Sequence, residues 1–295
     1  MKNKTAIYKI TLIMLSLFLW SACGNDDEIK ESRIDTSTPE LTAMDVWIRE
    51  NLTTPYNISI NYTFDDNELD NSRYLTPPKL REVEPFLDAF LEVMIRPFEE
   101  EVGTDFVKEY FPKLFVLVGS YNYNSDGSRR LGVAEGGKKV VLYELNYFTE
   151  RTSEASTSEL ARERFARYFH TIEHEFGHIL QQTKAYDAEK FGSITPQYRS
   201  TWNNLDEQEA LNLGYITPYS AKNMDEDFVE ILAMMLTNTA EDFEAILNLP
   251  ENDEAREALR AKLEIIVDYY RESWNIDLYE LQEIIAKKRQ AYFEK

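Results

Sequence analysis

Residues 165–182 read FARYFHTIEHEFGHILQQ, and this stretch carries two overlapping patterns. Apolar side chains recur at helical spacing, which predicts one packed face of a long helix over about residues 157–182. These side chains are Phe165, Phe169, Ile172, Phe176 and Leu180. The chain's 3 histidines all lie in the same stretch but outside the apolar stripe. We therefore expect a helix that packs by one face and lines a cavity with its histidine face.

The second pattern is His-Glu-x-x-His, formed by His174, Glu175 and His178. Four residues advance a helix by about one turn, so the two rings project from one face about 6 Å apart. That separation suits two ligands of one zinc ion, with Zn–N distances of about 2.0–2.1 Å. Glu175 then lies beside the ion and can act as general base towards an activated water. The alternative is a pair of histidines hydrogen-bonded in an ordinary core.

His170 lies one turn before His174 and forms a second pair at chelating distance. It is two turns from His178, about 11–12 Å along the helix axis, so one ion cannot easily bind all three rings. In this second pair the glutamate precedes the second histidine, where it is badly placed for a base. We expect His170 to support the site from behind the ligands, with direct ligation as the alternative.

A catalytic zinc site needs a third protein ligand and an open position. Since no histidine remains, we expect a carboxylate from residues 219–236. Glu226 and Glu230 are four residues apart and share one helix face, so Glu226 can ligate while Glu230 accepts the ring N–H of a ligand histidine. Asp225 and Asp227 are competing ligands. The alternative is a solvated acidic helix start, which the helix dipole favours.

Hydrophobic periodicity and turn residues outline the rest of the chain. Strands are predicted at residues 56–64, 114–118 and 139–143, and residues 119–138 are rich in turn formers. Helices are predicted from Pro78 to a stop or kink at Pro97 and Gly103, and at about 157–182, 206–213, 225–238, 251–272 and 277–293. Strands early and helices late indicate an α+β fold. We expect this fold to combine a small mixed sheet, the histidine-bearing helix and a helical C-terminal part.

The N-terminus has the sequence features of an export signal. Lysines precede the apolar residues 10–20, which are too few to span a bilayer comfortably. We expect residues 1–22 to be a signal peptide and Cys23 to be lipidated, with an ordinary secretory signal as the alternative. An acidic stretch follows at 24–28, which is either a surface-export tag or a solvated charge run. Residues 23–40 read as a flexible tether.

We expect one metallopeptidase domain over residues 41–295. Its N-terminal α/β part should extend to about residue 150, and its helical metal-binding part should cover about 151–295. The formal net charge of -21 argues against a nucleic-acid partner, because phosphates need a basic face. The single cysteine excludes an intrachain disulfide.

The spacing from His174 to Glu226 resembles the gluzincin metallopeptidases, and most closely the catalytic domain of the lethal-factor type. In that type a tyrosine lies seven residues before the ligand glutamate, and a supporting glutamate lies four after it. These positions are Tyr219 and Glu230 here. The resemblance implies that Tyr219 donates its hydroxyl to the developing oxyanion, whereas the alternative is an ordinary aromatic residue beside Pro218.

Most of the mature chain resembles a narrower family, the zinc-binding metallopeptidase lipoproteins found beside TonB-dependent nutrient importers. The matching stretches are residues 55–58, 119–121, 131–137, 174–178 and 226–230. This resemblance implies a Zn²⁺ cofactor, a lipid anchor in the outer membrane with exposure at the cell surface, and importer components as partners.

The expected function is therefore hydrolysis of amide bonds in a peptide or protein substrate. The resemblance to gluzincins also implies an edge strand that pairs with an extended substrate. Residues 139–145 are our candidate for it, with a plain core strand as the alternative. Two rival functions remain. One is a lipoprotein that captures peptides or glycans and uses the metal only structurally. The other is a hydrolase acting on a non-peptide amide or ester.

Overall fold

The computed structural model describes residues 40–63, 65, 67–70, 72–124, 127, 129–135, 138–149 and 159–294, with α8 side chains from Phe165 onward. The helices and strands of the described residues all lie in one compact unit, Thr42–Lys295. The predicted signal peptide and Cys23 lie outside the described residues. Among those residues, no helix has both the length and the apolar character needed to cross a membrane.

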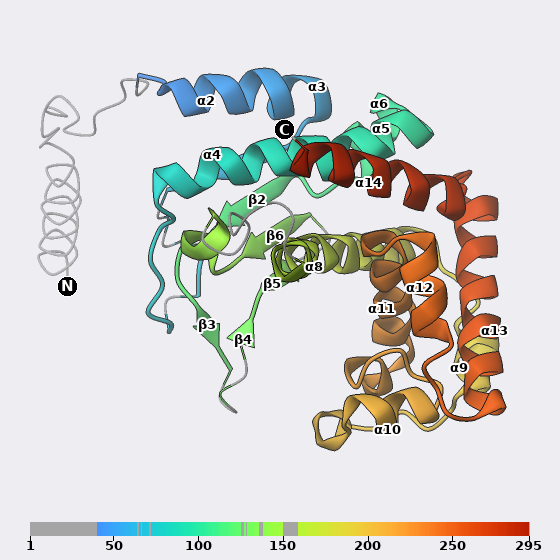
Figure 1. Ribbon diagram of the computed structural model, residues 1–295. Coiled ribbons are helices and arrows are strands. Elements are labelled where there is room, and N and C mark those ends of the chain that lie inside the picture. The colour runs from blue at the N-terminus through green and yellow to red at the C-terminus, as the bar shows by residue number, and fades with distance from the viewer. Residues whose placement is uncertain are drawn as a thin grey trace, which may run out of the picture. The chain divides into compact units, whose positions relative to one another are not determined.

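A four-stranded sheet forms the β layer, in the order β1-β2-β6-β5 (Figure 1). Its strands are β1 (Ser59–Asn61), β2 (Leu114–Leu117), β5 (Gly132–Glu135) and β6 (Lys139–Leu142). Strands β1, β2 and β6 run parallel, and β5 pairs antiparallel with β6. A separate antiparallel pair is formed by β3 (Asn122–Tyr123) and β4 (Arg129–Arg130). The expected α+β fold with a small mixed sheet is confirmed.

Alternation along the central strands explains why they are buried on both faces. Phe115 and Val140 point into the main core, whereas Val116 and Val141 belong to a second cluster on the opposite face. Successive strand residues face opposite sides, so an apolar run such as 139–142 marks a strand covered on both sides.

Three strand predictions need correction. Residues 139–145 are not an edge strand, because β6 is paired with β2 on one side and with β5 on the other. The edge strands are β1 and β5, and β5 lies within residues 119–138, where the sequence shows mainly turn formers. The strand predicted at 56–64 is reduced to β1, because Tyr56 ends a helix and Asn57 turns the chain at φ 58°.

Helices supply the rest of the fold. Those before the sheet's last strand are α2 (Ala43–Ile48), η1 (Arg49–Thr53), α3 (Thr54–Tyr56), α4 (Leu80–Ala89), η2 (Phe90–Ile95), α5 (Arg96–Val102) and α6 (Thr104–Tyr110). Those after it are η3 (Leu145–Tyr147), α8 (Glu159–Thr183), α9 (Ala188–Ile194), η4 (Trp202–Asn204), α10 (Glu207–Asn212), η5 (Tyr219–Lys222), α11 (Met224–Thr237), α12 (Ala240–Leu247), α13 (Asp253–Tyr269), η6 (Tyr270–Trp274) and α14 (Leu278–Phe293). The helices α2, α6, α9 and α12 were not predicted.

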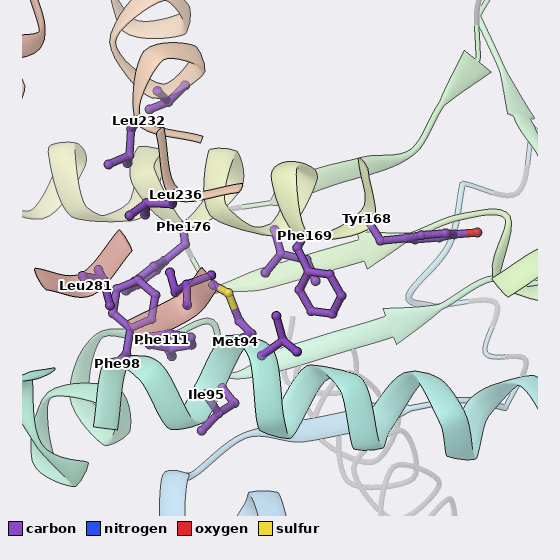
Figure 2. Packing of buried hydrophobic residues seen from close by; sticks show 14 of the residues in the cluster. Met94, Ile95, Phe98, Phe111, Tyr168, Phe169, Phe176, Leu232, Leu236 and Leu281 are labelled. Carbon is purple, nitrogen blue, oxygen red and sulfur yellow. The ribbon is translucent and has the colours of Figure 1, made fainter. Parts of the chain in front are cut away.

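The apolar stripe of α8 packs as its spacing predicts. Its five members are all buried. Phe176 points from α8 towards Phe98 and Phe111, with ring centroids 5.4 and 4.2 Å away (Figure 2). Full burial of such a side chain contributes about 1.5–3 kcal/mol. The C-terminal helix α14 packs against α5 and η2, which carry Phe98 and other residues of this core (Figure 1).

Candidate metal centre

Two helices and one short turn of 3₁₀ helix build a polar site on the histidine face of α8. Helix α11 contacts both α8 and η5. The side chain of Asn223 caps α11 by accepting from the backbone N–H groups of Asp225 and Glu226, at 2.9 and 3.0 Å. Because an N-cap fixes where the helix begins, it also fixes where the Glu226 side chain leaves the backbone.

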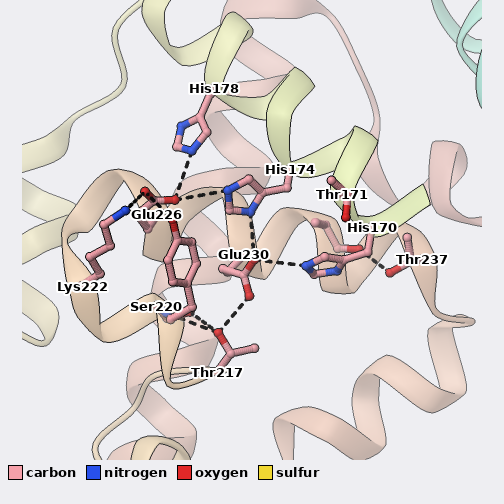
Figure 3. Close-up of polar contacts among 12 residues, drawn as sticks. His170, Thr171, His174, His178, Thr217, Ser220, Lys222, Glu226, Glu230 and Thr237 are labelled. Atoms are coloured by element: carbon pink, nitrogen blue, oxygen red, sulfur yellow. Dashed lines mark hydrogen bonds and ion pairs between the residues drawn. The ribbon is translucent and has the colours of Figure 1, made fainter. Parts of the chain in front are cut away.

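One carboxylate oxygen of Glu226 lies between two imidazoles. Its Oε2 is 3.2 Å from Nε2 of His174 and 3.2 Å from Nε2 of His178 (Figure 3). Ligand atoms at about 2.0 Å from a tetrahedral ion lie about 3.3 Å from one another. The three residues form a cluster with metal-ligand spacing. The structure therefore brings together the three predicted ligands at a separation that one zinc ion fits.

Glu230 lies on the other side of His174. Its Oε1 is 2.8 Å from His174 Nδ1 and 3.1 Å from His170 Nε2, while Thr217 Oγ1 donates to its Oε2 at 2.8 Å (Figure 3). This contact fixes the tautomer of His174 and directs Nε2 towards Glu226. His170, His174 and Glu230 also have metal-ligand spacing. Glu230 occupies Nδ1 of His174 and also contacts His170, and the supporting role of His170 stays a prediction.

The predicted oxyanion donor lies within reach of the same carboxylate. Tyr219 Oη donates to Glu226 Oε1 at 3.0 Å. Lys222 Nζ donates to both, at 2.7 Å to Glu226 Oε1 and 2.8 Å to Tyr219 Oη. Sequence reasoning missed Lys222. Its spacing, three residues after Tyr219 and four before Glu226, was the available signal, but extended Asn223 separates η5 from α11, so only the fold brings Lys222 to Glu226.

Gln181 was also missed. Its amide nitrogen lies 2.9 Å from Nδ1 of His178, one helical turn away on α8. If His178 ligates through Nε2, its Nδ1 carries the proton, so the amide must turn over to present its oxygen, which has no hydrogen-bond partner among the described residues. Each predicted histidine ligand thus has a partner on its second nitrogen, a carboxylate for His174 and an amide for His178.

Glu175 lies at a cleft of about 470 Å³ beside this cluster. The cleft is lined by Ala134, Glu175, His178, Ile179, Gln181, Gln182, Ala185, Tyr186, Ala188, Asn223, Asp225 and Glu226. The predicted base and two of the predicted ligands therefore share a solvent-accessible cavity. Ala134 belongs to the edge strand β5, so that strand reaches the same cleft.

Neither of the two competing ligands joins the cluster, although Asp225 lines the same cleft. Asp225 accepts a hydrogen bond from Tyr186 Oη at 2.8 Å, and Asp227 is fully buried against Lys262. Among the described residues, the clusters with metal-ligand spacing contain Glu226 or Glu230 and neither aspartate. The geometry thus favours Glu226 as the third ligand.

The charges of the site suit a cation. Burial raises the pKa of Glu226, but hydrogen bonds from His174, His178 and Lys222 outweigh burial and hold it well below its usual range. Burial lowers the pKa of His174, yet Glu226 and Glu230 raise it to about 10. Burial raises the pKa of Tyr219 to about 12, although Lys222 opposes the shift. Without metal, a proton on the imidazole of His174 partly balances the two carboxylates, and a divalent ion can take its place.

Comparison with known proteins agrees with this site. The family described as "Putative zinc-binding metallo-peptidase" matches residues 37–279. The chain belongs to this family. It is also similar to the crystal structure of a putative zinc-binding metallo-peptidase from Bacteroides caccae ATCC 43185, with a TM-score of 0.70 and 27% sequence identity over 87% of this chain and 97% of that one. No curated protein matches. The family description fits the predicted Zn²⁺ cofactor.

Proposed function

We propose that this protein is a zinc metallopeptidase whose ion is held by His174, His178 and Glu226. One observation carries the proposal: Glu226 Oε2 lies 3.2 Å from Nε2 of each histidine, beside a cleft that also contains Glu175. A structural zinc site has four protein ligands, whereas a catalytic site keeps one position open. Three convergent side chains at a cleft therefore favour catalysis.

When bound, zinc acts as a Lewis acid and lowers the pKa of water to about 7. Glu175 follows the first histidine on α8 and faces the cleft, so its carboxylate accepts the proton of the attacking water. It then gives that proton to the leaving amine. His174 and His178 are held by Glu230 and Gln181, so the histidine rings do not have to reorganise during the reaction.

Tyr219 supplies the donor for the oxyanion. Its hydroxyl contacts Glu226 and Lys222, and its ring packs 4.9 Å from that of Trp202. Rotation of the side chain would release the O–H from Glu226 for a substrate oxygen, where the hydrogen bond strengthens as charge develops.

The edge strand β5 is the candidate for substrate binding. Among the described residues it pairs only with β6, and its residue Ala134 lines the cleft. An extended peptide that adds to this edge gains main-chain hydrogen bonds. Binding by backbone favours a peptide substrate over a small amide or ester.

The cellular setting that we propose comes from the sequence. It is a lipoprotein anchored through Cys23 in the outer membrane, exposed at the cell surface and working with importer components. The signal-peptide grammar and the resemblance to importer-associated lipoproteins support it. The domain over residues 41–295, with its two parts, stays a prediction.

The test is peptide-library cleavage by the zinc-loaded protein with and without a chelator, together with Glu175→Gln. We expect this variant to keep its zinc and to lose at least about 100-fold in kcat, because general-base catalysis contributes about 10²–10⁴-fold. Glu257→Gln, an exposed glutamate on α13, is the matched control and should be fully active. Unchanged activity of Glu175→Gln would remove Glu175 as the base. No chelator-sensitive cleavage in the wild type would favour the capture function.

A further inference from the structure

The two oxygens of Glu226 have different surroundings. Oε2 faces the imidazoles of His174 and His178, at 3.2 Å from each Nε2. Oε1 faces away from them and accepts hydrogen bonds from Tyr219 at 3.0 Å and from Lys222 at 2.7 Å. The carboxylate therefore has one oxygen directed at the ligand cluster and one already held by two donors.

The donors themselves are held in place. Tyr219 and Lys222 occupy the two ends of η5, and Lys222 Nζ bonds the hydroxyl of Tyr219 while lying 4.7 Å from its ring centroid. The Tyr219 ring lies 4.9 Å from Trp202 and 5.9 Å from His174. The carboxylate side chain of Glu226 is only 12% exposed. This contact is more than an exposed i,i+4 ion pair, because one ammonium satisfies two acceptors beside a shielded carboxylate.

We infer that Lys222 and Tyr219 together restrict Glu226 to ligation through a single oxygen. A carboxylate can offer a metal one oxygen or two, and a second oxygen from Glu226 would take the position that a catalytic site must leave open. Lys222 is a positioning residue in this scheme. It keeps Oε1 bonded when Tyr219 turns towards the substrate, so the carboxylate does not rotate onto the ion at that moment.

This inference rests on the proposed metal site but not on peptidase activity. Its test is substitution of zinc by Co²⁺, whose visible absorption distinguishes four-coordinate from five-coordinate sites. The variants are Lys222→Met, Tyr219→Phe and the double variant, with Lys190→Met, an exposed lysine of α9, as the control. Cobalt content is measured by elemental analysis and folding by circular dichroism.

We expect the wild type, Lys190→Met and the conservative variant Lys222→Arg to show the intense absorption of a four-coordinate site. The double variant should bind cobalt fully but absorb more weakly per ion than the wild type, because Oε1 then joins the ligands. The absorption per cobalt ion of each single variant should lie between that of the wild type and that of the double variant. A double variant with full cobalt and an unchanged spectrum overturns the inference, as does a double variant that loses its cobalt.

The same samples separate this inference from the proposed function. A wild type that binds cobalt and shows the expected spectra but cleaves no peptide refutes the peptidase and leaves the role of Lys222 standing. A wild type that binds no cobalt refutes the metal site and the inference together.

Discussion

Helix α11 carries acidic side chains in two contrasting settings. Towards α8, Glu226 and Glu230 meet imidazoles, which can exchange a proton for a metal ion. Towards α13, Asp227 meets Lys262, and both side chains are 0% exposed. Lys262 also donates to the carbonyl oxygen of Gly214 at 2.8 Å, and Tyr198 donates to Asp227 at 3.0 Å. Adjacent residues of one helix therefore have an exchangeable partner on one side and a permanent partner on the other.

The difference between the two sides of α11 suggests how the helix is fixed in place while its ligand side chains stay available to a metal ion. The permanent pair ties the first turn of α11 to the C-terminal helices, which carry no motif recognisable in the sequence. A buried ion pair gives little net stability over apolar residues, but removing one partner is costly. We interpret the Asp227–Lys262 pair as the anchor that fixes α11 while the ligand side of the helix stays free to bind an ion.

The largest effect is expected on the anchored side. Lys262→Met leaves Asp227 buried without its cation and should lower the free energy of unfolding by about 3–5 kcal/mol. Adding Asp227→Leu to the same chain should recover most of this loss, because the lone buried charge is gone. Urea unfolding measures both.

An exposed ion pair gives the matched control. Lys287 and Glu283 lie 2.6 Å apart, with side chains 71% and 66% exposed, so Lys287→Met should change stability by no more than about 1 kcal/mol. If Lys262→Met were as mild as this control, the anchoring role of the pair would have to be abandoned.

The next effect concerns the contact between α8 and α11. A Cβ atom at Gly177 would lie 2.9 Å from Val229 Cγ1 and 3.0 Å from Leu232 Cδ2. Overpacking of this kind costs about 1–3 kcal/mol, against a helix-propensity gain of up to about 1 kcal/mol. Gly177→Ala should therefore reduce stability and weaken zinc binding, since it separates Glu226 from the histidines. Thermal unfolding and a chelator competition assay measure the two.

Gly192 in α9 is the control for this substitution. A Cβ atom there would lie 3.6 Å from Met224 Sδ, an ordinary contact, so Gly192→Ala should be neutral or stabilising by up to about 1 kcal/mol. Adding Val229→Ala to Gly177→Ala should restore zinc affinity. Failure of that rescue would show that close helix approach does not set the ligand spacing.

The sequence predicts what one helix determines by itself. The placement of His174 and His178 follows from helical geometry, and the burial of Phe176 follows from apolar periodicity. Glu226 could be predicted as a ligand because, with no histidine left, only a carboxylate could complete the zinc site. For the histidines and Phe176 the deciding spacing lies within a few residues, whereas Glu226 rests on the elimination of other ligand types.

Features that depend on distant residues could not be predicted in this way. Strand order decides that β5 and not β6 is the edge strand beside the cleft. That order is set by pairing between segments far apart in the chain. Residues 119–138 are rich in turn formers, so their three short strands β3, β4 and β5 were not predicted. Lys262 looks like any helix-surface lysine until α13 packs against Asp227. The functions of Lys222 and Gln181 depend on protein partners that only the assembled site supplies.

The smallest expected effect is a difference in zinc affinity between variants that remove the partner of His174 and variants that remove the partner of His178. His174 has the carboxylate of Glu230 on its second nitrogen, and His178 has the neutral amide of Gln181. A charged acceptor raises ligand basicity and fixes the ring, so Glu230→Gln should weaken zinc binding by about 10–100-fold. A neutral hydrogen bond contributes about 0.5–1.5 kcal/mol, so Gln181→Leu should weaken it by only about 2–10-fold. Competition with a chromogenic chelator at one pH ranks the variants. The reverse ranking would mean that His178 and not His174 is the ligand whose orientation limits metal affinity.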